Sequence, residues 1–178
     1  RKEYDENDNL VRVIYPDNAT TSSEYDHRFN SIKKLTDERG IISTFEYDGQ
    51  GNLTKKTEAA GTEAARTTVL TYDATGRLLR SRVESDGITP AAEMTLTFDG
   101  NDNVTTITDP EGNVTNLQQF DGMGNPLSMR DPRGNEWTFS YDAAGRIRSI
   151  ANPLNEKIQF EYDGAGNRTA TTDATLKR

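Results

Sequence analysis

The chain has 178 residues, of which 29 are acidic and 21 basic, so its formal net charge at pH 7 is −8. It has no cysteine, which excludes disulfide bonds and thiolate metal sites, and no basic patch with interleaved aromatic residues that would mark a nucleic-acid-binding surface. Apolar residues make up about 36% of the chain when Gly is counted and Tyr is not, against roughly 45–50% in an ordinary globular domain. We therefore expect a sheet with one solvated face rather than a packed two-layer core.

An aromatic residue followed by Asp recurs eight times, at intervals of 21, 22, 25, 26, 22, 21 and 21 residues. Asn or Arg stands four residues after each of these Asp residues. A period of this kind is the signature of a repeat protein, so we interpret residues 1–178 as a single array of about eight repeats. The anchor aromatic residues are Tyr4, Tyr25, Tyr47, Tyr72, Phe98, Phe120, Tyr141 and Tyr162.

The elements within one repeat can be taken in chain order from residues 139–162. Alternation of apolar and polar residues predicts a strand that ends at the anchor. Residues 142–145 predict a type I turn, with Asp first and Gly fourth in the left-handed conformation of a G1 bulge. Residues 146–150 form the returning strand, and residues 152–155 a second turn with Pro at its second position. The sequence therefore predicts an all-β fold, an antiparallel meander of repeated β-hairpins.

Three places along the chain depart from the simple repeat. Phe29 occupies the position that Gly holds in other turns, and a bulky residue is an outlier at positive φ, so we expect the turn at Asp26–Asn30 to be distorted or longer. The two longest repeats carry their extra residues in Ala59–Arg66 and Ser85–Glu93. Both insertions fall on the second turn, the one that joins successive repeats.

The returning strands often show apolar residues three positions apart, as at Leu10 and Val13 or at Ile147 and Ile150. The other examples are Ile32 with Leu35 and Val104 with Ile107. A regular strand of period two would place the two members on opposite faces. Either the bulge resets the register or both faces are partly covered, and the pattern alone leaves both explanations open.

No residue pattern predicts a catalytic, cofactor or metal site, so we expect no enzyme activity in these residues. The single histidine, His27, lies in a predicted turn, and neither GxSxG nor HExxH is present. Asp99, Asn101 and Asn103 alternate as calcium ligands do, and so do Asp5, Asn7 and Asn9. An EF-hand loop would also need Gly at its sixth and Glu at its twelfth position, which are absent, so turn formation is the better explanation.

Two further features have a structural and a functional interpretation. Five N-x-[ST] sequences begin at Asn18, Asn52, Asn103, Asn113 and Asn167, and most follow from a turn Asn that leads into a β-rich strand. The anchor aromatic residues would form a ladder along the sheet. Cross-strand packing is the simpler explanation of that ladder. A platform for stacking on sugar rings is the alternative, because repeat proteins use extended surfaces for binding.

The units YDGAGNRTATTD and FDGNDNVTTITDPEGNVT resemble the YD repeat of the Rhs family, which includes bacterial Rhs and polymorphic toxins, insecticidal toxin complex C subunits and the teneurins. The resemblance covers essentially the whole chain. It implies a curved β-ribbon that forms part of a spiralling β-shell, with neighbouring repeats on either side. The chain would then be a fragment of a longer repeat protein, and in bacterial members the shell encloses a C-terminal toxin.

The resemblance implies a structural function, the enclosure of a toxin or partner polypeptide. It implies a secreted or cell-surface protein, delivered by a secretion system and without a membrane span. Family members close the shell with a segment that carries a DPxGL-type autoproteolysis motif. Residues 109–113 and 131–135 have Asn in place of its Leu, so we interpret them as repeat turns. The alternative function is an exposed module that binds glycans or a cell surface.

Overall fold

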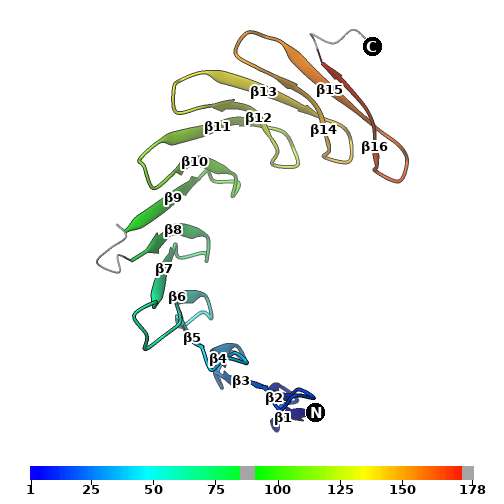
Figure 1. Ribbon diagram of the computed structural model, residues 1–178. Coiled ribbons are helices and arrows are strands. Elements are labelled where there is room, and N and C mark those ends of the chain that lie inside the picture. Colours follow the sequence, from blue (N-terminus) through cyan, green and yellow to red (C-terminus); the bar gives the residue numbers. More distant parts are fainter. Residues whose placement is uncertain (85–90, 174–178) are drawn as a thin grey trace. The chain divides into compact units, whose positions relative to one another are not determined.

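The computed structural model describes residues 1–84 and 91–173, and within them it contains sixteen β-strands and no helix. The order of the strands in the sheet is their order in the chain (Figure 1), and the paired strands run antiparallel. The predicted all-β antiparallel meander is confirmed. In the described residues, no helix is present that could cross a membrane.

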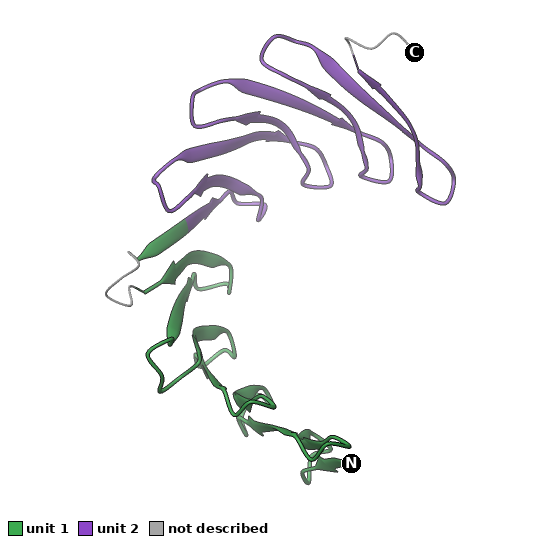
Figure 2. Cartoon of the chain, in the orientation of Figure 1, with its two compact units in different colours: residues 1–94 green, residues 95–178 purple. Residues whose placement is uncertain are grey.

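The chain divides into two compact units, Arg1–Met94 and Thr95–Arg178, and the division falls within one strand, β9 (Figure 2). Strands that begin in the first unit are β1 (Lys2–Tyr4), β2 (Leu10–Ile14), β3 (Thr20–Tyr25), β4 (Ile32–Thr36), β5 (Ile42–Tyr47), β6 (Leu53–Glu58), β7 (Arg66–Tyr72), β8 (Leu78–Val83) and β9 (Ala92–Phe98). Those of the second unit are β10 (Val104–Thr108), β11 (Val114–Phe120), β12 (Pro126–Arg130), β13 (Glu136–Tyr141), β14 (Ile147–Ala151), β15 (Lys157–Tyr162) and β16 (Arg168–Asp173).

Each odd-numbered strand ends at an anchor aromatic residue, and the turn that follows has the predicted geometry. We call these turns the first rim. After β13 the Gly145 N–H donates to the Asp142 carbonyl at 2.9 Å, and the Asp142 N–H donates to the Arg146 carbonyl at 2.9 Å. Gly145 has φ 75°, a conformation that costs Gly nothing and other residues about 1–2 kcal/mol. Asp8 and Asp102 adopt the same conformation where Gly is absent.

The turn at Asp26–Asn30 is one residue longer, as expected from Phe29. The left-handed residue is Asn30, with φ 54°, and its N–H donates to the Asp26 carbonyl four residues back at 2.9 Å. Phe29 thereby avoids positive φ. The extra residue shows in the ladder, where Tyr25 pairs with Ile32, seven positions on.

The turns from even-numbered to odd-numbered strands, which we call the second rim, use the same backbone geometry. The Gly134 N–H donates to the Asp131 carbonyl at 2.8 Å, and Asn155 takes the left-handed position in the turn that begins at Asn152. The insertion predicted at Ala59–Arg66 lies on this rim between β6 and β7. The insertion at Ser85–Glu93 lies mostly outside the described residues.

The bulge resolves the three-residue spacing of apolar residues in the returning strands. Tyr141 pairs with Ile147, and Phe139 pairs with Ile150, with the register shift between them. Residues directly opposite each other share a face, so both Ile residues lie on the face of Tyr141 and Phe139. We call this side, which carries the anchor aromatic residues, the anchor face. The same shift places Leu10 with Val13, Ile32 with Leu35, and Val104 with Ile107 on it.

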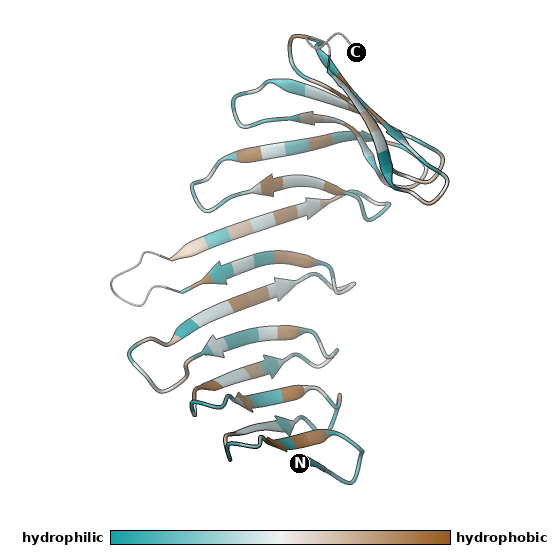
Figure 3. Cartoon of the chain, turned by 45° about the vertical axis from the view of Figure 1, so that its right-hand side comes forward, coloured by the Kyte–Doolittle hydropathy of each residue, from teal (hydrophilic) through white to brown (hydrophobic). Residues whose placement is uncertain are grey.

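The opposite side, the polar face, carries charged and hydroxyl side chains. In the first unit Lys34 lies 3.0 Å from its cross-strand partner Glu24, and Lys55 lies 3.3 Å from Glu46. Exposed pairs of this kind contribute little to stability, but their charges keep this face solvated. Figure 3 shows the resulting alternation of hydrophobic and hydrophilic residues along the strands.

The described residues form a single layer with almost no enclosed core. Ser128 and Ala151, exposed by 2% and 4%, are the buried residues of the described part of the chain. The anchor aromatic residues from Tyr25 to Tyr162 are half-buried, and Tyr4 is 55% exposed. A low apolar content therefore produces a sheet whose apolar face is covered by cross-strand packing alone.

Candidate functional site: the linked turns and the anchor face

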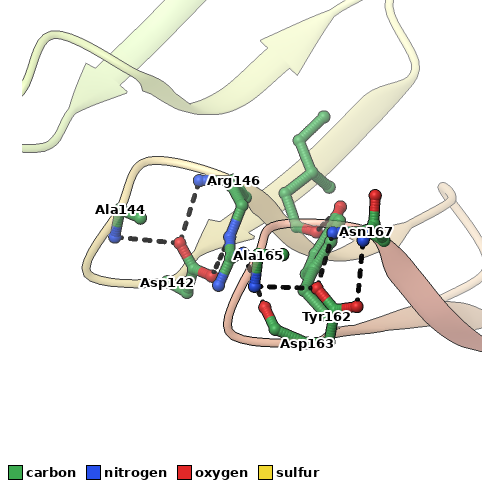
Figure 4. Close-up of polar contacts among 8 residues, drawn as sticks. Asp142, Ala144, Arg146, Tyr162, Asp163, Ala165 and Asn167 are labelled. Carbon is green, nitrogen blue, oxygen red and sulfur yellow. Dashed lines mark hydrogen bonds and ion pairs between the residues drawn. The ribbon is translucent and has the colours of Figure 1, made fainter.

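The Asp that follows each anchor closes the first-rim turn with its carboxylate. In the last described repeat, Asp163 Oδ1 accepts the N–H groups of Ala165 at 3.0 Å and Asn167 at 2.8 Å, and Asp163 Oδ2 accepts Asn167 Nδ2 at 3.0 Å (Figure 4). This arrangement, which we call the Asp clamp, explains why Asn recurs four residues after Asp. It recurs at Asp5, Asp48, Asp99 and Asp121 on the first rim, and at Asp109 and Asp131 on the second.

Hydrogen bonds to the ionised carboxylates lower the pKa values of the clamp residues. The Asn167 side-chain amide is the main cause of the lowered pKa of Asp163, and the Asn167 backbone N–H adds to it. At Asp73 the backbone N–H of Arg77 is the main cause of a low pKa, with the Thr75 hydroxyl next. Because such bonds favour the charged form, the turns are most stable when their Asp residues are ionised.

The anchor tyrosines link each repeat to the one before it through their hydroxyl groups. The Tyr162 hydroxyl donates to the Ile147 carbonyl at 2.8 Å. The corresponding carbonyl is the first of the preceding even-numbered strand in each case. The other bonds are Tyr25 to Leu10 at 3.2 Å, Tyr47 to Ile32 at 2.7 Å, Tyr72 to Leu53 at 2.9 Å and Tyr141 to Pro126 at 3.0 Å.

Partial burial of these rings has an electrostatic consequence. Desolvation raises the pKa values of Tyr47, Tyr72 and Tyr141, and the nearby Asp of the preceding repeat raises them further. A raised pKa favours the protonated, hydrogen-bond-donating form of these three hydroxyl groups. Their fixed direction toward the main chain favours the packing interpretation of the aromatic ladder.

Arg146 links two repeats through three contacts. Its Nε donates to Asp142 Oδ2 at 2.7 Å, its Nη1 donates to the Asp163 carbonyl at 3.3 Å, and its guanidinium lies 4.6 Å from the centre of the Tyr162 ring. Figure 4 shows this group between the two turns. Arg77 makes the equivalent clamp with Asp73 at 2.6 Å.

Side chains of one first-rim turn also pack on the left-handed glycine of the next turn. A Cβ atom added to Gly124 would lie 2.8 Å from Asn103 Oδ1, and one added to Gly51 would lie 3.1 Å from the Phe29 ring. At Gly112 on the second rim no atom lies within 4 Å of the corresponding position. Gly124 and Gly51 are therefore favoured by close contact between repeats as well as by backbone conformation.

The structure uses the candidate calcium ligands as turn residues. Asp99 Oδ1 accepts the N–H groups of Asn101 and Asn103, both at 2.9 Å, and Asn103 Nδ2 donates to Asp99 Oδ2. Asp5, Asn7 and Asn9 make the same bonds. No group of three or more His, Asp or Glu side chains within residues 1–84 and 91–173 could hold a metal ion.

The other candidate residues also lie in turns. His27 is exposed in the lengthened turn at Asp26–Asn30. The side-chain amides of Asn52, Asn103, Asn113 and Asn167 all donate to a clamp carboxylate, so a glycan on these nitrogens would compete with the turn. Residues 109–113 and 131–135 form second-rim turns of the repeat type, as predicted.

Three features of this surface were not predicted from the sequence: the hydroxyl bonds of the anchor tyrosines, the stacking on first-rim glycines, and the position of Arg146 between two turns. The available signal was the coincidence of Tyr, Gly and Asn or Arg at fixed offsets in most repeats. Offsets of this kind are required when one repeat must fit onto the next.

Comparison with known families accounts for this repeated unit. Residues 31–63, 98–136, 120–157 and 141–175 match the family described as RHS Repeat, and together they make up more than half of the chain. The chain belongs to the RHS repeat family. The resemblance expected from the sequence is thus confirmed, and the Asp clamp and the tyrosine link are features of these RHS repeats. No curated protein matches the chain at a significant level.

Solved structures with a similar arrangement of strands include the Tc holotoxin pore of Photorhabdus luminescens, with 16% identity and a TM-score of 0.44. A TcdB2-TccC3 structure without the hypervariable C-terminal region has 15% identity and a TM-score of 0.44. Each comparison covers 97% of this chain and 12% of the other. A porin-like protein from Bacteroides uniformis has 13% identity and a TM-score of 0.45, over 97% of this chain and 86% of that one.

Proposed function

We propose that this chain, a single array of about eight RHS repeats, is a wall segment of a larger β-shell that encloses a polypeptide partner. The partner would be a toxin or another part of the same parent protein, as the family resemblance implies. The chain would be non-catalytic, with no catalytic, cofactor-binding or metal-binding residue of its own. The parent would be secreted or displayed at a cell surface.

The observation that carries the proposal is the uncovered anchor face. A sheet of 178 residues with two buried residues in its described part lacks the enclosed core of an independent domain. The anchor aromatic residues and the apolar residues paired with them lie on one face, as the pairing of Tyr141 with Ile147 illustrates. Such an apolar face is removed from water only when a second protein layer or an enclosed polypeptide covers it.

The two edge strands of the sheet are open to pairing with further strands. β1 pairs with β2, and β16 pairs with β15, and within the described residues neither strand has a partner on its other side. Unpaired edges invite further strands. Neighbouring repeats would satisfy them and continue the sheet.

The proposal also holds that these residues carry out no catalysis. The Asp residues that could act as acids or bases are occupied by their clamps, as at Asp99 and Asp163. The pKa values of Asp109 and Asp121 are lowered, with the side-chain amides of Asn113 and Asn125 as the main causes. General acid–base catalysis near pH 7 requires a carboxyl pKa that is raised.

The proposal can be tested on the natural protein that carries these residues, isolated intact from its source. We expect a mass several times the 19.8 kDa of this chain, and a polypeptide that resists protease until the repeat sheet is opened by denaturant. An intact mass near that of the chain, or a partner segment digested at once by protease, would contradict it.

A glycan- or cell-surface-binding module is the second candidate, and the exposure of Tyr4 at 55% is the observation that favours it. Stacking on sugars needs ring faces open to solvent. Titration of the isolated chain with varied glycans, followed by tyrosine fluorescence, separates the two candidates. The shell proposal predicts no response.

A further inference from the structure

A hollow of about 230 Å³ lies on the second unit between β13 and β16, next to the second rim. Ile150, Ile158 and Asp173 lie opposite one another across three strands and form its floor on the anchor face. Sites for whole small molecules are usually about 300–1,000 Å³, so this volume suits a single side chain. The lining residues are Trp137, Ile150, Asn152, Glu156, Ile158 and Asp173.

The turn beside this hollow inverts the Asp clamp. In the two preceding second-rim turns Asp comes first and Asn fifth, with Nδ2 to Oδ2 distances of 2.8 and 2.9 Å. Here Asn152 comes first and Glu156 fifth, and Asn152 Nδ2 donates to Glu156 Oε2 at 2.6 Å. Asn152 Oδ1 accepts the N–H groups of Leu154 and Glu156, so the turn itself is unchanged. The inversion moves the negative charge from the turn to the wall of the hollow.

Trp137, the one tryptophan of the chain, forms another wall of the hollow. Asn135 Nδ2 donates to Asp131 Oδ2 at 2.9 Å and is the main cause of the lowered pKa of Asp131, to which the Trp137 side chain adds a smaller effect. Ile158, in the floor of the hollow, is 37% exposed, and Leu154, in the turn that carries Asn152 and Glu156, is 77% exposed. The lining therefore combines an aromatic ring, apolar side chains and a carboxylate in one small hollow.

We propose that this hollow binds one Lys or Arg side chain of a polypeptide partner. The inference rests on the proposed function for the class of partner. The aliphatic stem of such a side chain would pack on Ile150 and Ile158, and its cation would lie against the Trp137 ring and the Glu156 carboxylate. A neutral sugar would leave the charge of Glu156 without a counter-charge, so a basic side chain fits this lining better.

Because Trp137 is the only tryptophan, its emission reports directly on the hollow in the full 178-residue chain. The probes are an acetylated Gly-Arg-Gly amide and its citrulline counterpart, which has nearly the same shape without the charge. We expect the Arg peptide to change Trp137 emission in a saturable way at low ionic strength and the citrulline peptide to bind at least about fivefold more weakly. Raising the salt concentration should reduce the difference.

The matched variants are Glu156→Gln, which keeps the acceptor for Asn152 Nδ2, and Glu111→Gln, which removes the same charge from another second-rim turn. We expect a loss of Arg-peptide affinity of roughly three- to tenfold for Glu156→Gln and no change for Glu111→Gln. Equal binding of the two peptides, or an emission change with a neutral trisaccharide instead, would overturn the inference. Equal binding of the two peptides leaves the shell proposal untouched, whereas a trisaccharide response favours the glycan-binding candidate. The mass and protease test decides the shell proposal independently, so the two proposals can fail separately.

Discussion

The hydroxyl of Tyr162 donates a hydrogen bond to the carbonyl of Ile147 at 2.8 Å, across the boundary between two repeats. This bond joins the last residue of one odd-numbered strand to the first residue of the preceding even-numbered strand. It recurs with Tyr25, Tyr47, Tyr72 and Tyr141. The anchor tyrosines therefore join successive repeats by hydrogen bonds along the sheet. Removing one hydroxyl group should lower the free energy of unfolding by a measurable amount.

Replacing Tyr162 with Phe keeps the half-buried ring and removes its hydrogen bond to the Ile147 carbonyl. We expect a loss of about 1 kcal/mol in the free energy of unfolding, the usual net value of one hydrogen bond. Urea denaturation followed by circular dichroism measures it. Tyr15→Phe is the control, because the Tyr15 ring is 37% exposed and should tolerate the change. Equal losses for the two variants would contradict the role given to the Tyr162 hydroxyl.

Stacking between turns is tested by comparing two glycines with nearly equal φ. Gly124 has φ 82° and Gly112 has φ 81°, so alanine costs each about 1–2 kcal/mol in backbone strain. At Gly124 the added Cβ would also lie 2.8 Å from Asn103 Oδ1, whereas at Gly112 it would meet nothing within 4 Å. We expect the urea midpoint of Gly124→Ala to fall further than that of Gly112→Ala. A matching fall in both would show that the first-rim turns do not depend on this contact.

A substitution at Arg146 can separate its bond to Asp142 within one turn from its contacts with the next repeat. Asn occupies this position in six other repeats, so Arg146→Asn should preserve the bond to Asp142 and lose the contacts with Tyr162 and the Asp163 carbonyl. We expect a loss of about 0.5–1 kcal/mol, measured by urea denaturation. Arg133→Asn, at a second-rim tip where Arg133 is exposed, serves as the control. A fully neutral Arg146→Asn would mean that the clamp alone matters.

The lowered pKa values of the clamp residues predict how stability depends on pH. For a carboxyl whose folded pKa lies below its ordinary value of 3.8, the stabilisation is complete above that value and is lost as pH falls through the folded pKa. The free energy of unfolding should therefore be level above about pH 5 and fall steadily below about pH 4. Urea midpoints measured from pH 7 to pH 2 test this.

Asp142→Asn should reduce the slope of that acid limb, because one fewer proton is taken up on unfolding through a clamp carboxylate. The level region near neutral pH should remain. An unchanged slope would indicate that the main acid-sensitive groups lie elsewhere in the chain.

The elements of the fold could be predicted because each depends on local chemistry. Asp at the first and Gly at the fourth position of a turn act within five residues, and the prediction at Asp142–Gly145 is confirmed. Phe29 stands at the turn position that requires positive φ, which is also a local conflict, so a longer turn could be expected. Sequence could not show that the left-handed residue would be Asn30, since that choice depends on the ladder on both sides.

Contacts between repeats were harder to predict. The face of Ile150 depended on the register between β13 and β14, which the bulge shifts by one residue. The Tyr162 bond and the Arg146 link require two turns to lie side by side. The hollow at Trp137 was missed for the same reason. Its one signal in the sequence was that Asn152 and Glu156 stand where the preceding second-rim turns have Asp first and Asn fifth.

The central claim, that the anchor face is covered in the natural protein, can be tested by hydroxyl-radical footprinting with mass spectrometry. Labelling at Trp137, Phe139 and Tyr141 is compared between the isolated chain and the intact natural protein, with Met123 as reference because it is 64% exposed on the first rim. The account predicts that labelling of the three aromatic residues falls several-fold in the natural protein while that of Met123 is retained. Equal labelling in both samples would contradict it, because the anchor face would then be open to solvent.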